Sequence, residues 1–295
     1  MSIDLTGRTA LITGAGTGLG RAHAHLLAAH GANIVVNDIP QSLDKAHAVA
    51  AEIAGRGGTA HAIAASVTDE AAVAAMIDEA TQRFGKVDIL VNNAGILRDK
   101  SFSKMTLADW RDVLDVHLTG AYLCTHALWD QMRANNYGRI VMTTSSSGLY
   151  GNFGQSNYGA AKMALVGLMQ TLSIEGAKNN IRVNCLAPTA RTAMTEGLLP
   201  PEALELLDPD RVSPALLALV ADNAPTRAIL LAGASGIERA TITMSHGIYI
   251  GHDQPAAAAD RILAEWDQIG EGATVPDMGA AQGMLEIHKA LAARA

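Results

Sequence analysis

The sequence predicts an α/β fold in which a doubly wound parallel sheet of about seven strands carries helices on both faces. Short β-rich runs alternate with helical patterns in steady order, which is typical of strand–helix–strand crossovers. Most of these runs are almost continuously apolar, as strands are when helices cover both of their faces. The strands are expected at 9–13, 33–37, 60–64, 87–92, 139–144, 181–187 and 227–232, and the helices near 18–30, 42–55, 69–84, 106–134, 157–178 and 201–222.

One domain is expected over residues 1–250, because no repeat and no linker rich in proline, glycine or serine divides them. After Gly251 the chain becomes rich in alanine, and "AAAADRILAEWDQI" predicts an added amphipathic helix. Residues 251–295 are therefore expected to form a C-terminal helical extension. This helix could seal the core, or it could cover a pocket or an oligomer interface.

The composition narrows the class of protein. The 295 residues are 49% hydrophobic, which suffices for one large core, and the net charge of −7 argues against a nucleic-acid-binding surface. The start "MSIDLTGR" lacks the basic and apolar segments of a secretory signal, and the longest apolar runs are too short to span a bilayer. Cys124 and Cys185 lie in apolar surroundings without a partner spacing. A cytoplasmic protein without nucleic-acid or membrane partners is therefore expected.

A glycine-rich turn, "TGAGTGLG" at 13–20, follows the first expected strand and leads into a helix. Its glycines would let a pyrophosphate approach the backbone, and the start of the helix offers free N–H groups and a positive dipole end. The strict G-x-G-x-x-G spacing fails at Leu19, whereas T-G-x-x-x-G-x-G fits. Glycines that only allow tight strand–helix packing are the alternative, but the position favours a dinucleotide site of Rossmann type. The residues expected there are Gly14, Gly16, Thr17, Gly18, Leu19 and Gly20.

Asp38 closes the second expected strand, in "VVNDI". A carboxylate at this place can accept hydrogen bonds from the adenosine ribose hydroxyls, whereas it would repel a 2′-phosphate. No arginine or lysine lies within 13–20 or next to Asp38 in the sequence to bind that phosphate. The expected cofactor is therefore NAD rather than NADP. The alternative is an aspartate that only makes a turn at the end of a strand.

Tyr158 and Lys162 stand four residues apart at the head of an expected helix, in "SNYGAAKMALVG" (156–167). Residues with this spacing share one helical face, and Leu165 and Met169 continue that face. A buried, unpaired lysine would be costly, so its place on an inward face needs a chemical reason. The pair therefore indicates a reaction site at the start of this helix.

Ser145 ends the fifth expected strand, thirteen residues before Tyr158. Ligands of doubly wound sheets bind outside the carboxyl ends of the strands, so Ser145 can meet the head of the next helix. Tyr158 as phenolate would take the proton of an alcohol, and the ammonium of Lys162 would favour the phenolate and hold ribose hydroxyls. Ser145 would orient the substrate oxygen. This set suits proton transfer coupled to hydride transfer.

A hydrolase with a serine nucleophile is the rival chemistry for Ser145. Such an enzyme uses G-x-S-x-G at a strand-to-helix turn. The segment "TTSSSGL" has no glycine two residues before any of its serines. The pattern therefore favours the dehydrogenase.

The motifs "TGAGTGLG", "NNAG" (92–95), Ser145 and "YGAAK" (158–162) together resemble the short-chain dehydrogenase/reductase family, over roughly residues 4 to 250. A closer resemblance runs from 92 to 196, in "NNAGILRDKSF" and "NYGRIVMTTSSSGLYGNFGQSNY". This stretch is similar to the (3R)-hydroxyacyl-CoA dehydrogenase module of peroxisomal multifunctional enzymes, also described as 17β-hydroxysteroid dehydrogenases.

The resemblance implies further site residues. His117, in "DVHLTG", stands where many members have an asparagine that completes a proton relay, so it either joins Ser145, Tyr158 and Lys162 in catalysis or simply packs. Tyr158 and Lys162 would also contact the cofactor. The remaining residues implied at the cofactor or beside it are Ser66, Val67, Asn92, Asn93, Ala94, Gly95, Pro188 and Thr192.

Several other side chains have two interpretations. The apolar residues that flank the catalytic segments could wall a substrate pocket or belong to the core; they are Leu149, Tyr150, Phe153, Met194, Leu198 and Leu199. The basic residues after "NNAG" could meet coenzyme A phosphates or form a solvated face; they are Arg98, Lys100 and Lys104. The histidines of the first helix are expected on a solvated flank; they are His23, His25 and His30. No metal is expected, because His246, His252 and Asp253 lack a third strong ligand at a suitable spacing.

The sequence thus predicts an NAD-dependent secondary-alcohol dehydrogenase. The resemblance favours a (3R)-hydroxyacyl-CoA as substrate, with a 17β-hydroxysteroid or another bulky cyclic alcohol as the alternative. A catalytically silent NAD-binding scaffold is the alternative of another class. Family resemblance also implies a homodimer or homotetramer.

Overall fold

The computed structural model describes residues 3–191, 205–250, 255–272, 274, 287 and 291–292. The chain divides into two compact units, Met1–Ala240 and Thr241–Ala295, which are described separately. The expected domain boundary at residue 250 stays a prediction.

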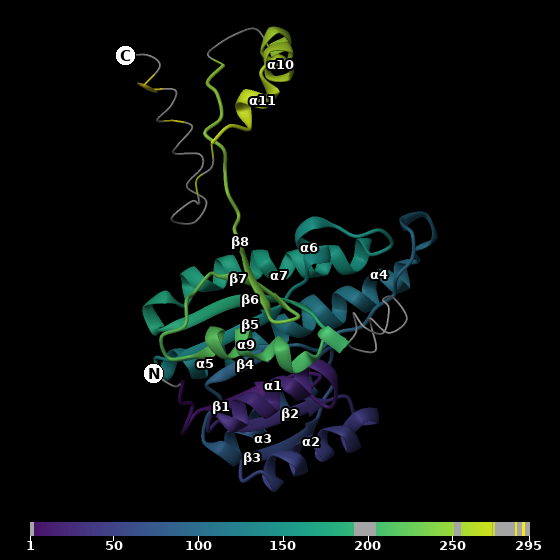
Figure 1. Ribbon diagram of the computed structural model, residues 1–295, viewed down its shortest axis with the longest axis vertical. Coiled ribbons are helices and arrows are strands. Elements are labelled where there is room, and N and C mark those ends of the chain that lie inside the picture. Colours follow the sequence, from purple (N-terminus) through teal and green to yellow (C-terminus); the bar gives the residue numbers. More distant parts are fainter. Residues whose placement is uncertain are drawn as a thin grey trace. The chain divides into compact units, whose positions relative to one another are not determined.

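The first unit is built on an eight-stranded sheet, in the order β3-β2-β1-β4-β5-β6-β7-β8. All neighbouring strands are parallel except β7 and β8, which are antiparallel. The parallel strands confirm the predicted doubly wound fold (Figure 1). The strands are β1 (Thr9–Ile12), β2 (Asn33–Asp38), β3 (Thr59–Ala64), β4 (Ile89–Asn92), β5 (Gly138–Thr143), β6 (Ile181–Thr189), β7 (Ile229–Gly233) and β8 (Gly236–Ala240).

Helices cover the sheet on both faces, and each face has its own apolar core. Alternate strand residues point to opposite faces, so Ile12 lies in one core and its neighbour Leu11 in the other. The core around Ile12 includes residues of α1 (Gly18–Ala29), α2 (Leu43–Gly55) and α9 (Ser213–Val220). The core around Leu11 includes residues of α3 (Glu70–Phe84), α5 (Gly120–Ala134) and α7 (Ser156–Glu175).

Four elements differ from the expectation. The helix expected over 201–222 is interrupted, because the 3₁₀ turn η5 (Pro209–Arg211) precedes α9. The long helix expected over 106–134 consists of α4 (Leu107–Leu114), the π-helical turn η3 (Asp115–Thr119) and α5. A short helix, α6 (Ser146–Tyr150), follows β5, and the edge strand β8 was not expected. All five residues of β8 lie outside the buried core, so the strand has no apolar run that could predict it.

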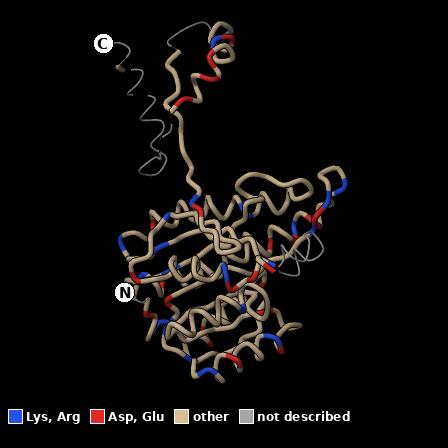
Figure 2. The backbone as a smooth tube through the Cα atoms, viewed as in Figure 1, with Lys and Arg blue, Asp and Glu red and all other residues tan. Residues whose placement is uncertain are grey.

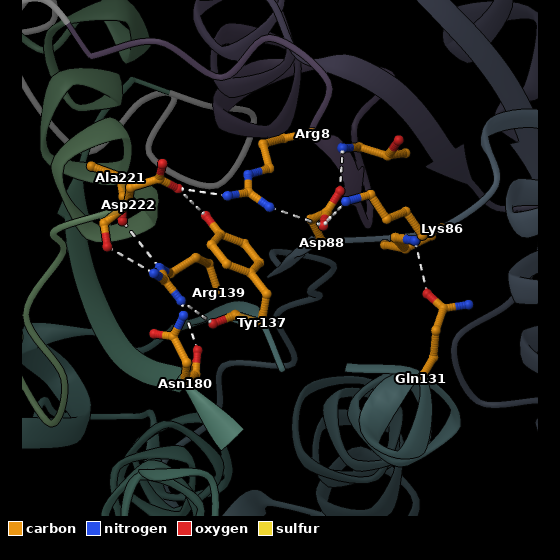
Figure 3. Close-up of polar contacts among 12 residues, drawn as sticks. Arg8, Lys86, Asp88, Gln131, Tyr137, Arg139, Asn180, Ala221 and Asp222 are labelled. Carbon is orange, nitrogen blue, oxygen red and sulfur yellow. Dashed lines mark hydrogen bonds and ion pairs between the residues drawn. The ribbon is translucent and has the colours of Figure 1, made fainter. Parts of the chain in front are cut away.

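A polar network joins the amino-terminal ends of the central strands (Figure 3). Arg139 at the start of β5 is 1% exposed and donates hydrogen bonds to four carbonyl oxygens, which belong to Gly138, Asn180, Ala221 and Asp222. The ring of Tyr137 lies under both the Arg139 and the Arg8 guanidinium groups, at 4.1 and 3.5 Å from the ring centroid. Its hydroxyl donates to Asp222 at 2.7 Å. This network ties β5 to the segment after α9.

The second unit contains α10 (Pro255–Ala264) and α11 (Trp266–Ile269), where the sequence predicts one amphipathic helix. Arg261 and Glu265 form an ion pair at 2.7 Å near the junction of these two helices.

Acidic and basic residues are interspersed along the elements of the first unit (Figure 2). In the described part of the chain, no helix is both long enough and apolar enough to cross a membrane.

His23 of α1 corrects one expectation, because it is fully buried rather than part of a solvated flank. Its Nδ1 lies 2.8 Å from the Ser213 hydroxyl at the start of α9, and its Nε2 has no hydrogen-bond partner among the described residues. Burial lowers the pKa of His23 to about 3. The folded protein therefore holds this ring in its neutral form.

We expect His23 to make the protein less stable in mild acid. The unfolded chain takes up a proton on His23 below its ordinary pKa of about 6.5, whereas the folded protein does so only near 3. The free energy of unfolding should therefore fall with decreasing pH, by up to about 1.4 kcal/mol per pH unit from this residue. Urea titrations across this range should show a shallower fall for His23→Phe, whereas His47→Phe, on an exposed position of α2, should keep the wild-type slope. Equal slopes in all three proteins would contradict the assignment.

Candidate active site

The carboxyl ends of the parallel strands gather most of the predicted site residues on one edge of the sheet. The glycine turn follows β1, Asp38 ends β2, and Ser66 and Val67 follow β3. The segment 92–95 ends and follows β4, Ser145 follows β5, and Pro188 lies in the last part of β6. The fold therefore places residues from six strand ends at the edge where such sheets bind ligands.

The glycine turn is shaped by close backbone approaches. Gly14 has a φ of +62°, and a Cβ atom there would lie 3.0 Å from the Cα of Ala94. A Cβ on Gly20 would lie 2.5 Å from the Gly14 carbonyl oxygen. At Gly16 it would lie 2.7 Å from the Asp38 carboxylate. A side chain at any of these positions would collide with the protein's own backbone or with Asp38, so the glycines allow the tight packing that shapes the turn, and the pyrophosphate contact stays a prediction.

The start of α1 is prepared for an anion. Its N-cap, Thr17, is exposed and makes no side-chain capping bond, and no acidic residue lies in the first turn. The first backbone N–H groups of α1 therefore have no side-chain acceptor at the N-cap. These groups lie at the positive end of the helix dipole. Gly18 and Leu19 are half-buried in this first turn, and their contact with a phosphate stays a prediction. These features fit a dinucleotide pyrophosphate.

Asp38 fixes the outer side of the same turn. One carboxylate oxygen accepts the Gly16 N–H at 2.9 Å, and the other accepts the Ile39 N–H at 2.8 Å. Each carboxylate oxygen has further lone pairs that can accept ribose hydroxyls. The structure adds one cation that sequence neighbours did not indicate: the Cβ of Lys45, on α2, would lie 3.1 Å from a Cβ on Gly16. Lys45 is exposed at this corner.

The segment "NNAG" (92–95) braces the glycine turn. The hydroxyl of Thr13 accepts the N–H groups of Asn93 and Ala94, both at 3.0 Å. The Asn93 amide donates back to the carbonyl oxygens of Thr13 and Gly14, at 2.8 and 3.1 Å. Asn92 is buried and donates to Thr125 of α5 at 3.1 Å. Asn93 therefore braces the glycine turn through its backbone, whereas Asn92 ties the end of β4 to α5.

The structure brings Ser145 and Tyr158 together. Ser145 is the N-cap of α6, is 8% exposed, and accepts the Ser147 N–H at 3.1 Å. Burial raises the pKa of Tyr158 above its ordinary value, while a hydrogen bond with Ser145 acts in the opposite direction and the charge of Asp99 raises it further. In this structure Ser145 is the group that favours the phenolate.

Lys162 differs from the expectation that its ammonium directly activates Tyr158. Its Nζ donates to the Thr143 carbonyl oxygen at 2.5 Å and lies 5.4 Å from the centroid of the Tyr158 ring. Lys162 is 3% exposed, and burial lowers its pKa to about 7. The lysine is therefore held against the end of β5. From there its Nζ has donors to spare for a ligand.

His117 lies beside the tyrosine, in the π-helical turn. Its ring meets the Tyr158 ring edge to face at 5.2 Å, and its Nε2 lies 3.0 Å from the Ile96 nitrogen and 2.8 Å from the Ile96 oxygen. A Cβ on Gly95 would lie 2.4 Å from this ring, so glycine is required there. Burial lowers the pKa of His117 to about 3, and the charge of Lys162 adds to this.

The second ring nitrogen of His117, Nδ1, is buried and has no hydrogen-bond partner in the described part of the chain. His117 and Lys162 both line a cavity of about 10 Å³, together with Val67 and Asn92. This volume suffices for one water molecule. The geometry suits packing against Tyr158 as well as a proton relay through the cavity, and the relay stays a prediction.

The predicted substrate wall is described only in part. Tyr150 and Phe153 are 71% and 91% exposed, whereas Leu149 packs against the core on the α7 face of the sheet. Met194, Leu198 and Leu199 lie outside the described residues, as does Thr192 of the cofactor set. In the basic cluster, Lys100 pairs with Asp109 at 2.8 Å and Arg98 with Asp112 at 3.6 Å. These pairs favour the solvated-face interpretation for both cations.

The family of the chain follows from a comparison with known proteins. A profile described as short chain dehydrogenase matches residues 8–202, well over half of the chain. The chain belongs to the short-chain dehydrogenase family. It is accordingly an oxidoreductase that acts on CH–OH groups.

Individual relatives of this short-chain dehydrogenase agree with that assignment. Peroxisomal multifunctional enzyme A of Dictyostelium discoideum is 43% identical over 277 residues, which cover 91% of this chain and 61% of that enzyme. The full-length peroxisomal multifunctional enzyme type 2 of Drosophila melanogaster has a similar structure, with a TM-score of 0.82 and 36% identity over 99% of this chain and 50% of that one. The chain thus spans less than two thirds of both relatives.

A 7α-hydroxysteroid dehydrogenase is also similar, with a TM-score of 0.73 and 32% identity over 79% of this chain and 95% of that one. Its structure was solved with NADH and 7-oxo glycochenodeoxycholic acid. A nicotinamide cofactor in this short-chain dehydrogenase agrees with the glycine cradle and with the free start of α1.

Proposed function

We propose that this short-chain dehydrogenase oxidises a secondary alcohol to a ketone with NAD, and that its substrate is a (3R)-hydroxyacyl-CoA. The observation that carries the proposal is the meeting of Ser145, Tyr158 and Lys162 at the sheet edge that also holds the glycine cradle. The resemblance to peroxisomal multifunctional enzymes supports the acyl-CoA substrate. The product is the corresponding 3-ketoacyl-CoA.

In this mechanism each side chain has a distinct task. Ser145 donates a hydrogen bond to the substrate oxygen and orients it toward Tyr158. Tyr158, as phenolate, accepts the hydroxyl proton while the carbinol C–H bond breaks. Lys162 would hold the ribose hydroxyls, and its positive charge would favour the phenolate form of Tyr158 before the proton is transferred. When bound, the oxidised nicotinamide supplies the acceptor for the hydride that leaves the carbinol carbon.

The preference for NAD is tested by Asp38→Ala. Loss of the carboxylate removes the ribose acceptor and the bond to the Gly16 N–H, so the affinity for NAD should fall. It also removes the charge that repels a 2′-phosphate and leaves Lys45 at that corner, so NADP should be accepted better. The ratio of kcat/KM for NADP to that for NAD should rise about tenfold or more. Asp44→Ala, on an exposed position of α2, is the control, and an unchanged ratio in Asp38→Ala would contradict the proposal.

The substrate is tested by comparing two alcohols under the same conditions. Purified protein and NAD are mixed with a (3R)-hydroxyacyl-CoA or with a 17β-hydroxysteroid, and NADH formation is followed by its absorbance. A much higher kcat/KM for the thioester supports the proposal. A preference for the steroid, which the likeness to a hydroxysteroid dehydrogenase makes the second candidate, would overturn the acyl-CoA substrate but leave the dehydrogenase chemistry. If neither alcohol gives NADH while the protein still binds NAD, the result would favour a catalytically silent NAD-binding scaffold.

The assembly and the compartment stay predictions. The family resemblance implies a homodimer or homotetramer. The sequence predicts a cytoplasmic protein, and the multifunctional relatives carry peroxisomal names.

A further inference from the structure

Asn157 immediately precedes Tyr158 in the first turn of α7 and is fully buried. Its side-chain oxygen accepts the Tyr158 N–H at 2.8 Å. Its side-chain nitrogen donates to the carbonyl oxygen of Arg98 at 3.2 Å and to that of Asp109 at 3.1 Å. Both ends of this buried amide are therefore bonded to main-chain groups.

The two carbonyl oxygens belong to the loop after β4 and to α4, on the side of the site opposite the start of α7. Arg98 lies in the loop after β4 that begins with "NNAG", and Asp109 lies in the first turn of α4. The neighbours of Asn157 hold the same loop from outside: the Lys100 N–H donates to the Gly154 oxygen at 2.8 Å, and Gln155 donates to Asp99 at 2.7 Å. In these two contacts Lys100 and Asp99 are exposed and Gly154 and Gln155 are half-buried, whereas Asn157 is fully buried and links the start of α7 to the loop after β4 and to α4.

The start of α7 has little else to fix it. Its N-cap, Gln155, makes no side-chain capping bond, and the first turn contains no acidic residue. The Tyr158 N–H is one of the first helical N–H groups, which have no partner within the helix. Asn157 supplies that partner and at the same time attaches the turn to α4. This amide therefore fixes the backbone of Tyr158 relative to α4.

We propose that Asn157 is a positioning residue, which sets the place of the Tyr158 hydroxyl relative to Ser145 and to the substrate. This proposal rests on the proposed function, in which Tyr158 moves the proton. Asn157 touches neither substrate nor cofactor and acts through Tyr158. Small displacements of a reacting group lower the rate strongly, because the reacting atoms must meet at defined distances.

The test compares Asn157→Ala with a matched control. Asn184 of β6 is also fully buried; its amide donates to two carbonyl oxygens, of Leu219 and Pro225, and accepts the Ala228 N–H. Asn184→Ala therefore loses the same kind of bonds away from Tyr158. We expect Asn157→Ala to lower kcat by about 100-fold with an unchanged dissociation constant for NAD. Asn184→Ala should lower only the melting temperature. Equal kcat in the two variants would overturn the proposal.

A double-mutant cycle separates this proposal from the proposed function. If Asn157 acts through the Tyr158 hydroxyl, Asn157→Ala should cause little further loss when Tyr158→Phe is already present. A full additional loss would show that Asn157 acts elsewhere and would overturn the proposal. If Tyr158→Phe alone keeps full turnover, the proposed mechanism fails first, and the positioning role fails with it. Should Asn157→Ala not fold, Asn157→Ser, which keeps one hydroxyl donor, replaces it in both comparisons.

Discussion

Replacement of Tyr158 by phenylalanine is expected to lower kcat by about 10²- to 10⁴-fold, because the change removes the group that accepts the alcohol proton. The variant loses one hydroxyl and keeps the ring that meets His117 edge to face. We therefore expect the fold and the affinity for NAD to remain. NADH formation from the preferred alcohol measures kcat, and quenching of protein fluorescence by NAD measures binding.

The control for this prediction is Tyr122→Phe on α5. Tyr122 is 48% exposed and stacks on His126, so its hydroxyl is not expected to serve the reaction. Wild-type kcat in Tyr158→Phe would show that another group takes the proton. Loss of both kcat and NAD binding would instead point to a disturbed site.

Replacement of Arg139 by methionine is expected to lower the free energy of unfolding by about 3–5 kcal/mol. The side chain is 1% exposed, and its loss leaves four carbonyl oxygens without their donor. Methionine fills much of the volume, so the effect reports the lost hydrogen bonds rather than a large cavity. Urea unfolding followed by circular dichroism gives the measurement. kcat at a temperature where the variant stays folded should be unchanged, because Arg139 lies at the amino-terminal ends of the strands (Figure 3).

Arg133→Met is the matched control for Arg139. Arg133 lies near the end of α5 and pairs with Asp130, whose side chain is 92% exposed. Surface ion pairs contribute about 0–1 kcal/mol, so this variant should unfold close to wild type. A similar small effect at Arg139 would mean that water replaces its hydrogen bonds at low cost.

The fold was largely predictable, because the first seven strands are apolar runs with helices between them. β8 was not, since its middle residues, Glu238 and Arg239, point to no core and only pairing with β7 defines the strand. The π-helical turn around His117 was also missed. Hydrophobic periodicity cannot distinguish it from a continuous α-helix when the residues on both sides still alternate between core and solvent.

The places of the candidate site residues were predictable where a residue type carries the chemistry itself. Ser145, Tyr158 and Asp38 lie at the expected edge of the sheet, while their roles stay predictions. Asn157 was not singled out, because its partners are main-chain carbonyl groups 48 and 59 residues away in the sequence. Lys45 was missed for a similar reason, since only the packing of α2 brings it next to Gly16, which also contacts Asp38. Lys162 was placed correctly on the inner face, but its bond to Thr143 depends on the end of β5.

The strand order also governs how the site arises during folding. β1, which precedes the glycine turn, pairs with β2 on one side and with the distant β4 on the other, and β4 pairs with β5, which precedes Ser145. The glycine turn and Tyr158 therefore come together only when β4 and β5, which lie between them in the chain, have joined the sheet. Such non-local strand pairing slows folding, because long loops must close before the contacts form. Binding of NAD is therefore expected to appear after most of the helical signal has returned in a refolding experiment, as a late reporter of the assembled sheet.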